Sequence, residues 1–480
     1  MKILMVASEA APFAKTGGLA DVLGSLPGAL IKQGAEVRVI MPKYGTISSK
    51  LRESIVHKCV IYVGVGWRNL YCGIEEAVCN GVTYYFIDNE FYFNRDGLYG
   101  FGDDGERFAF FCRAVLEAIP HLDFTPDILH CHDWQAGMVP VLLEAHYRQL
   151  ELYRPIKTVF TIHNLRYQGI CGIDQMKEWF SLSDDYFTED KLEFFHSASF
   201  MKGGLTYSHL LSTVSHSYAE EIKYPFYGEQ LDGLLNARSK ELWGIVNGID
   251  YEEFNPAKDP LIYQTYTKTK LAGKDANKVA LQEELGLAVD EKIPVIGLIS
   301  RLVDQKGLDL IACVLDEILA EEVQFVVLGT GDGKYEHMFW EATRRYPGKV
   351  SANLRFDNTL AHKIYAASDL FLMPSLFEPC GLGQLISLRY GTLPIVRETG
   401  GLKDTVISYN EATGEGNGFS FANYNAHDML YTIRRATGIC RKKTLRNKLR
   451  KAAMSCDFSW QSSAGKYMEL YHTLVPEAVE

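Results

Sequence analysis

Residues 377–406 read FEPCGLGQLISLRYGTLPIVRETGGLKDTV, and this stretch indicates a parallel α/β fold. An apolar run at 370–373 precedes it and is typical of a buried strand. Leucines at helical spacing follow within 382–388, and a second apolar run at 393–396 ends in Thr-Gly-Gly. Such strand–helix–strand units bind ligands outside the carboxyl ends of their strands. Glu378 and the bare glycine backbone are then expected in one crevice, although a carboxylate here also suits a simple helix cap.

The first strand of the chain, residues 3–7, is followed by a second candidate loop. Gly17 and Gly18 remove two side chains where a helix begins, so its free N–H groups can approach a phosphate, with Lys15 beside them. The pattern is neither a P-loop nor G-x-G-x-x-G. An ordinary strand–helix turn therefore remains an alternative to a phosphate site.

Two cations bracket a third loop. Arg301 and Lys306 follow the apolar strand at 294–298 and precede a helix that starts at Leu308. Two positive charges beside a helix start predict an anion site.

Polar residues also follow other apolar strands of the first half. His130, His132 and Asp133 lie at the end of one such strand, and His163-Asn164 follow the next. No third metal ligand lies near the two histidines in sequence, so hydrogen bonding to hydroxyls is favoured over metal binding. A satisfied turn residue is the plain alternative for His163.

Composition restricts the function classes. The chain has 480 residues, of which 47% are hydrophobic and 23% charged, and a net charge of −11, which disfavours nucleic acid or an anionic membrane as the main partner. Ten cysteines without a C-x-x-C pair are typical of reduced, mostly buried thiols. No apolar run approaches the roughly 18 residues of a membrane span. These features predict a cytoplasmic protein, with a mature plastid protein as the alternative.

The central stretch, together with Lys-x-Gly-Gly-Leu at 15–19, resembles the bacterial glycogen synthases and plant starch synthases. The likeness runs over about residues 1–474. Members of this family are retaining glucosyltransferases, a kind of hexosyltransferase, that extend α-1,4-glucan from ADP-glucose. The resemblance implies the GT-B fold: two doubly wound Rossmann-like domains facing across a deep cleft, with a C-terminal helix that crosses back to the first domain. The expected ranges are 1–250 for the acceptor-side domain, 251–456 for the nucleotide-sugar domain and 457–480 for the helix.

The resemblance also implies roles for individual residues. The catalytic group is expected to comprise His163, Asn164, Arg301, Lys306 and Glu378. The donor diphosphate and nucleotide are expected to contact Lys15, Gly17, Gly18, Arg301, Lys306, Gly329, Thr330, His362, Tyr365, Cys380, Gly381 and Leu382. The donor sugar is expected to contact His163, Asn247, Glu378, Thr399 and Gly400, and the acceptor side to include Asp21, Tyr99 and Asp133.

The chemistry expected of these groups needs neither metal nor pyridoxal phosphate. The sequence contains no Asp-x-Asp, the usual metal-holding motif of sugar-nucleotide enzymes, so cations and helix starts would stabilise the leaving diphosphate. Retention without an evident nucleophile favours a front-face mechanism in which the leaving phosphate takes the acceptor's proton. Ile386 occupies the place where many two-domain transferases carry a ribose-binding Glu, which leaves the ribose contact open, with Gln384 as the nearest polar side chain.

Two other readings remain at this point. The same architecture serves sugar-nucleotide epimerases and pyridoxal-phosphate phosphorylases, and a nucleotide-sugar-gated binding protein would need no catalysis. The sequence also does not decide between ADP-glucose and UDP-glucose, and it leaves the oligomeric state open.

Two further segments carry structural predictions. Residues 56–87 predict an antiparallel insertion, and the basic run at 441–450 predicts a solvated helix face.

Overall fold

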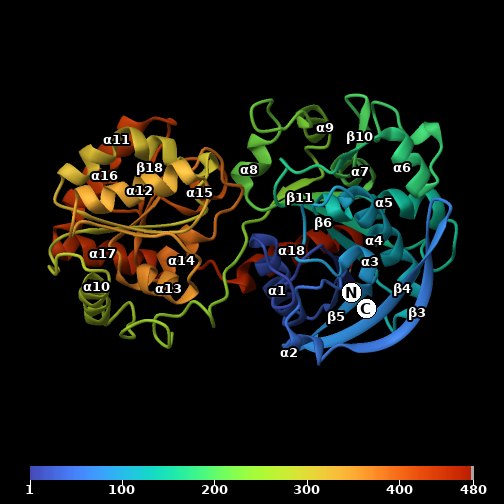
Figure 1. Cartoon of the computed structure of the whole chain (residues 1–480), viewed down its shortest axis with the longest axis horizontal. Coiled ribbons are helices and arrows are strands. Elements are labelled where there is room, and N and C mark those ends of the chain that lie inside the picture. The colour runs from blue at the N-terminus through green and yellow to red at the C-terminus, as the bar shows by residue number, and fades with distance from the viewer. Residues whose placement is uncertain (477–480) are drawn as a thin grey trace. The chain divides into compact units, whose positions relative to one another are not determined.

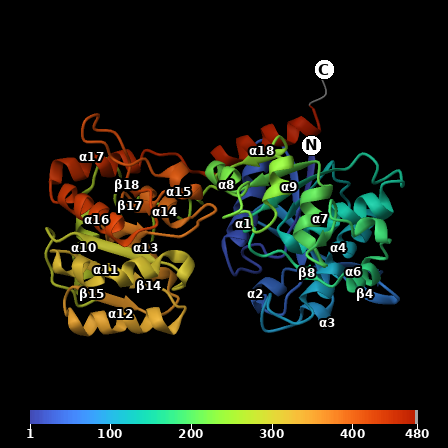
Figure 2. The same cartoon turned by 90° about the horizontal axis from the view of Figure 1, so that it is seen from above.

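The structure is a computed structural model that describes residues 1–476. The chain forms two compact units: Met1–Gly248 with the chain from Trp460 onwards, and Ile249–Ser459. Each unit is built around its own mainly parallel sheet (Figures 1 and 2).

The sheet of the first unit has the strand order β12-β11-β7-β6-β1-β2-β5-β4-β3. The expected antiparallel insertion is present, because β3 and β4 form a long hairpin whose second strand pairs antiparallel with β5. All other pairings in this sheet are parallel. The strands are β1 (Lys2–Val6), β2 (Glu36–Pro42), β3 (Val56–Val65), β4 (Arg68–Cys79), β5 (Val82–Asp88), β6 (Ile128–His132), β7 (Lys157–Ile162), β11 (Leu210–Thr213) and β12 (Leu242–Gly244).

Helices from both ends of the chain complete the first unit. The last helix packs beside the first, and Trp460, Tyr467, Leu470 and Tyr471 enter the hydrophobic core with the strand residues (Figure 2). Residues 170–199 hold a small antiparallel sheet. The elements that matter below are α1 (Gly18–Ile31), α4 (Asp104–Ala118), α5 (Met138–Leu142), α7 (Phe200–Tyr207), α9 (Asp232–Ala237), α18 (Trp460–Leu474), β8 (Ile170–Cys171), β9 (Glu193–Phe194) and β10 (Ser197–Ser199).

The second unit is a three-layer α/β/α domain with the parallel strand order β15-β14-β13-β16-β17-β18. Figure 1 shows α11, α12 and α16 on one face of this sheet and α10, α13, α14 and α17 on the other. The strands are β13 (Val295–Ile299), β14 (Gln324–Leu328), β15 (Val350–Asn353), β16 (Leu370–Met373), β17 (Leu393–Arg397) and β18 (Phe419–Phe421). The helices are α10 (Ala272–Glu284), α11 (Leu308–Ala320), α12 (Gly333–Arg345), α13 (Asn358–Ala367), α14 (Gly383–Arg389), α15 (Gly400–Thr405), α16 (Ala426–Cys440) and α17 (Lys443–Ala453).

The structure corrects the interpretation of the basic run at 441–450 as a solvated helix face. Arg450, on α17, is completely buried, and its guanidinium donates to Asp369 over 2.8 Å. Lys278 of α10 binds the other carboxylate oxygen over 2.7 Å. Burial alone would raise the pKa of Asp369, but the two cations outweigh it and hold that pKa at about 2. The prediction of a fully solvated face was therefore wrong for Arg450, because α17 packs against the end of the sheet where β16 begins.

Candidate functional site

The second sheet changes direction between β13 and β16. From β13 the chain proceeds to β14 and β15 on one side, then returns to add β16, β17 and β18 on the other. In open parallel sheets, ligands bind at the carboxyl ends of the two strands that flank such a switch point. Arg301 and Lys306 follow β13, and Glu378 follows β16, so the topology brings three predicted site residues to one place.

A direct ion pair joins two of these residues. Lys306 Nζ lies 2.7 Å from Glu378 Oε2, and Ser375 Oγ donates to the same oxygen over 3.0 Å. The side chains of Lys306 and Glu378 are only 18% and 10% exposed, which shields the pair from water. Arg301 lies two residues after β13, in the loop that leads to Lys306, and is exposed. The pair gives the switch point a positioned cation beside a positioned carboxylate.

The Glu378 loop is held closely by its neighbours. Leu376 N donates to the carbonyl of Gln305 over 2.9 Å, which ties this loop to the one that carries Lys306. On the other side, a Cβ added at Gly400 would lie 2.1 Å from the Glu378 carbonyl oxygen, and Gly400 has a φ of 44°. Only glycine permits this approach, as the Thr-Gly-Gly pattern predicts.

The Gly329–Thr330 loop lies at the same edge of the sheet, after β14. Gly329 has a φ of 153°, and a Cβ there would lie 1.9 Å from the Ser300 carbonyl oxygen. Leu302 N donates to the carbonyl of Thr330 over 2.8 Å. The loop is therefore fastened to the loop that carries Arg301.

Several residues predicted to contact the nucleotide lie inside the second unit. His362 is 2% exposed, and its Nδ1 pairs with Asp259 over 2.8 Å while its ring stacks on Phe254. Tyr365 is 6% exposed and packs on Phe371. These contacts fix the orientation of both rings, but the other ring nitrogen of His362, Nε2, is buried without a hydrogen-bond partner among residues 1–476. Others are also buried or half-buried within their loops: Cys380, Gly381 and Leu382. Thr399, predicted to contact the donor sugar, is buried as well.

The amide of Gln384, the polar group nearest to Ile386, is turned inward. Gln384 is completely buried, and its Nε2 donates to the carbonyls of Cys380 and Gly381 over 2.9 and 2.8 Å. Its side chain therefore shapes the 380–381 turn.

The first sheet has its own switch point, between β1 and β6. The loop after β1 carries Lys15, which forms a 2.5 Å ion pair with Asp21 on the first turn of α1. Gly17 is the N-cap of α1, and Gly17 and Gly18 are both exposed. The exposed helix start beside a lysine is the arrangement that the sequence predicts for an anion site.

Two carboxylates with raised pKa values lie at this edge. Burial raises the pKa of Glu9 to about 7 although Thr16 donates to it twice, over 2.6 Å from N and 2.9 Å from Oγ1. Burial likewise raises the pKa of Asp133 to about 7 although the backbone N–H of His163 donates to it over 2.7 Å. Tyr99 reaches the same region, with its hydroxyl 2.7 Å from Ser8 Oγ. Groups that titrate near neutrality are enriched at functional sites.

Three imidazoles form a column across the ends of β6 and β7. The rings of His130 and His132 are 4.1 Å apart between centroids, and those of His132 and His163 are 5.2 Å apart. Nδ1 of His132 lies 2.9 Å from Nε2 of His163. Burial lowers the pKa of His130 and of His163 to about 3, and that of His132 well below its usual value. All three rings are therefore neutral at physiological pH.

Two amides complete the first unit's candidate group. Asn164 follows His163, and its N–H lies 3.4 Å from Asp133 Oδ1. Asn247, after β12, is 5% exposed, and its Oδ1 is buried without a hydrogen-bond partner among residues 1–476. A buried amide oxygen without a partner is unusual in proteins and is consistent with a ligand contact.

Sequence reasoning missed Glu9, Ser375 and the contact between His132 and His163. Glu9 and Ser375 lie three and two residues after the ends of the buried strands β1 and β16, the same signal that identified the other polar residues. The histidine contact joins residues 31 positions apart and depends on the pairing of β6 with β7.

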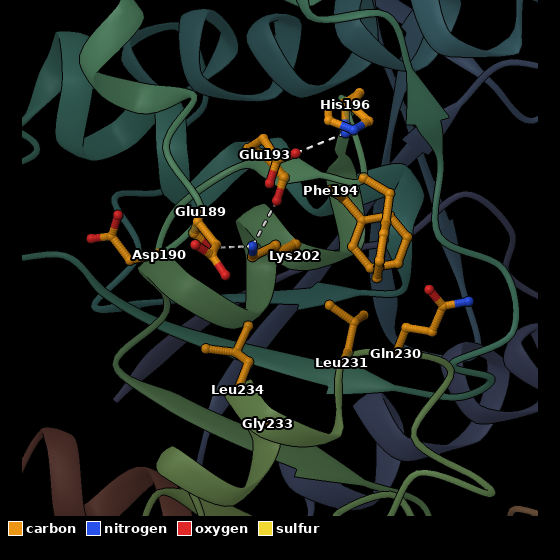
Figure 3. Close-up of a pocket in the computed structure, with 11 residues that line it drawn as sticks. Glu189, Asp190, Glu193, Phe194, His196, Lys202, Gln230, Leu231, Gly233 and Leu234 are labelled. Carbon is orange, nitrogen blue, oxygen red and sulfur yellow. Dashed lines mark hydrogen bonds between the residues drawn. The ribbon is translucent and has the colours of Figure 1, made fainter.

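A separate pocket of about 700 Å³ lies beside the β9–β10 turn and the start of α9 (Figure 3). Lys202 Nζ donates to the carbonyls of Glu189 and Glu193 over 2.5 and 2.6 Å, and His196 N donates to Glu193 Oε1 over 2.7 Å. None of the residues predicted for the site lines it.

Within residues 1–476 the side chains form no cluster of three or more metal-ligating groups. In the same range, every helix is too short or too polar to cross a bilayer.

Comparison with known proteins identifies the family of both units. The family described as "Starch synthase catalytic domain" matches residues 2–237, and "Glycosyl transferases group 1" matches residues 283–454. A glycogen synthase of Desulforamulus reducens is 56% identical over 475 residues, which cover 99% of each chain. A glycogen synthase of Geobacillus stearothermophilus is 54% identical, with 99% of this chain and 98% of the relative covered.

Solved structures agree with this result. The catalytic domain of starch synthase IV from Arabidopsis thaliana, bound to ADP and acarbose, superposes with a TM-score of 0.91 at 35% identity, covering 98% of this chain and 99% of that one. A sucrose-phosphate synthase of Thermosynechococcus elongatus, 17% identical with a TM-score of 0.62 and covering 99% and 100% of the two chains, shares the fold. The predicted GT-B fold and the predicted resemblance are both confirmed. This chain belongs to the glycogen and starch synthase family of glucosyltransferases.

Proposed function

We propose that this protein transfers glucose from ADP-glucose to the non-reducing end of an α-1,4-glucan with retention of configuration. The single structural observation that supports this most is the Lys306–Glu378 pair at the switch point of the second sheet. A cation there suits a diphosphate, and a carboxylate beside it suits sugar hydroxyls. The donor is assigned to ADP-glucose because the solved starch synthase relative binds ADP.

In the proposed mechanism, negative charge develops on the diphosphate as the sugar bond breaks. Lys306 and Arg301 would stabilise that charge from the second unit, and Lys15 with the start of α1 would do so from the first. Glu378 would bind the sugar and favour positive charge on its ring. The leaving phosphate would take the proton of the acceptor hydroxyl, so no side chain needs to act as a base.

The first unit's remaining groups are assigned to the sugars. His163 and Asn247 would bind the donor glucose, and Asp133, Asp21 and Tyr99 would lie towards the acceptor. The division into an acceptor-side domain (1–250), a nucleotide-sugar domain (251–456) and a returning helix (457–480) belongs to the same proposal.

The relatives named above are bacterial, and we assign the reaction to the cytoplasm.

The test is a transfer assay with radiolabelled ADP-glucose or UDP-glucose and glycogen. We expect label from ADP-glucose to precipitate with the polymer, and digestion by an α-1,4-specific amylase to release it. Transfer from UDP-glucose alone would overturn the donor assignment. Nucleotide release without polymer-bound label would overturn the transfer itself.

A further inference from the structure

The contact between His132 and His163 contains one proton whose position decides what His163 offers to a ligand. A neutral imidazole has one N–H donor and one bare nitrogen. Because Nδ1 of His132 and Nε2 of His163 are 2.9 Å apart, one of the two atoms carries a hydrogen and the other accepts it. Two arrangements satisfy this distance. If His132 donates, its Nε2 is bare and Nδ1 of His163 carries a hydrogen. If His163 donates, Nε2 of His132 carries a hydrogen and Nδ1 of His163 is bare.

The surroundings of His132 distinguish the two arrangements. Its other nitrogen, Nε2, is buried and has no hydrogen-bond partner among residues 1–476. The neighbouring His130 offers none, because its Nδ1 pairs with Tyr471 and its Nε2 with Thr161, over 2.7 and 2.6 Å. If His163 donated, the proton of His132 would lie on Nε2 as a buried N–H without an acceptor. If His132 donates from Nδ1, its Nε2 is a bare nitrogen, and unpaired buried N–H groups are rarer in proteins than under-satisfied acceptors.

We infer that His132 is a positioning residue that donates from Nδ1 to Nε2 of His163, and so fixes His163 as the tautomer with its proton on Nδ1. Nδ1 of His163 has no partner within the described chain, and the residue is only half-buried. The backbone of His163 is held independently, since its N–H donates to Asp133 over 2.7 Å.

The consequence concerns the chemistry of His163. With Nε2 occupied and Nδ1 protonated, the ring presents a hydrogen-bond donor to a ligand oxygen beyond the end of β7. It has no free nitrogen with which to remove a proton from an acceptor hydroxyl. The inference rests on the proposed function, and it assigns His163 to binding and not to general base catalysis.

The first test reads the tautomers directly. Full-length protein labelled with ¹⁵N in its imidazoles is measured by solid-state ¹⁵N NMR, and the signals are assigned by their loss in His132→Asn and His163→Gln. We expect Nδ1 protonated and Nε2 bare in both residues. A protonated Nε2 on His163, or an imidazolium in either residue at pH 7, would overturn the inference. The NMR measurement reports the protonation of the two rings whether or not the protein has the proposed transferase activity.

The second test compares substitutions by nucleotide release with glycogen. The amide nitrogen of His132→Asn occupies the place of Nδ1 and can still donate, whereas His132→Leu cannot. We expect His132→Asn to keep kcat within about threefold and His132→Leu to lose about tenfold, with the KM for glycogen nearly unchanged. His130→Leu is the matched control, because it alters the same buried column without touching His163, and its kcat should stay within about threefold. Equal losses in both His132 variants would reduce His132 to a packing role.

Discussion

Replacing Lys306 by alanine tests the cation at the switch point of the second sheet. The ammonium group is only 18% exposed and lies 2.7 Å from Glu378, so it is fixed in position before any ligand binds. Loss of one such preorganised donor typically costs about 2.7–4 kcal/mol of barrier, or about 100- to 1000-fold in kcat. The assay is ADP release from ADP-glucose with glycogen, measured as kcat and KM.

The same change also removes the partner of a buried carboxylate. Among the residues that the structure describes, the Glu378 carboxylate would keep only the hydroxyl of Ser375 as a partner, and loss of a charged hydrogen bond destabilises a protein by about 1.5–3 kcal/mol. A thermal unfolding measurement therefore accompanies the kinetics. Lys334→Ala is the matched control: it breaks a 2.6 Å ion pair with Asp304 in which both side chains are more than half exposed, and activity should stay within about twofold.

A double variant separates the two roles of Lys306. If Lys306 only holds Glu378 in place, Lys306→Ala should have little further effect once Glu378→Gln is present. If Lys306 binds the diphosphate, the double variant should be at least about tenfold less active than Glu378→Gln alone. A further loss below about threefold, or near-normal activity of Lys306→Ala, would refute the direct role.

Three other predictions concern metal, pH and a buried charge. Prior treatment with EDTA should leave turnover unchanged, because the proposed mechanism stabilises the diphosphate with protein cations. Glu9 and Asp133 have folded pKa values of about 7, above their unfolded values of about 4, so their stabilisation is full below pH 4 and is lost as the pH rises through 7. His130 and His163 have folded pKa values of about 3, and that of His132 lies well below its usual value, whereas an unfolded histidine titrates near 6.5, so the stability these rings contribute is full above pH 6.5 and is lost as the pH falls towards 3. Between pH 7 and 4.5 the losses from the three imidazoles offset the gains from the two carboxyls, so the unfolding midpoint should change little in that range and fall below it. Arg450→Met leaves Asp369 buried with one cation fewer and should lower the free energy of unfolding by about 3–5 kcal/mol in urea titrations.

Each of these three predictions can be contradicted by a specific result or checked with a control variant. Activity that is lost with EDTA and restored by a divalent cation would contradict the first. The double variant Glu9→Gln with Asp133→Asn removes the stabilising carboxyls, so its midpoint should already decline from pH 6.5 downward; an unchanged profile would contradict the assignment of the pKa values. Arg441→Met removes an exposed guanidinium from the same basic run and should leave the stability nearly unchanged.

The sequence predicted those features that depend on local pattern. Apolar strands followed by polar loops placed Lys306, Glu378 and Gly400 at strand ends, and parallel topology brought them together. The positive φ of Gly400 and its close contact with the Glu378 carbonyl follow from the same pattern, because two glycines after a strand indicate a close approach.

The remaining features depend on packing between distant segments. Lys306 and Glu378 are 72 positions apart, and nothing in either motif states that they touch. Arg450 resembles its exposed neighbours in sequence, and only the docking of α17 against Asp369 buries it. His362 and Tyr365 lie on a helix that sequence reasoning placed at the nucleotide. The structure shows that both side chains are buried within the second unit, and their contact with the nucleotide stays a prediction.

The position of α18 has a consequence for biosynthesis. This helix supplies Trp460, Tyr467, Leu470 and Tyr471 to the interior of a unit whose other residues end at Gly248. The ribosome makes the intervening second unit, Ile249–Ser459, before it makes this helix. The half of the protein that is translated first therefore waits for the last segment to emerge before its interior is filled, while the half translated second already has all of its residues.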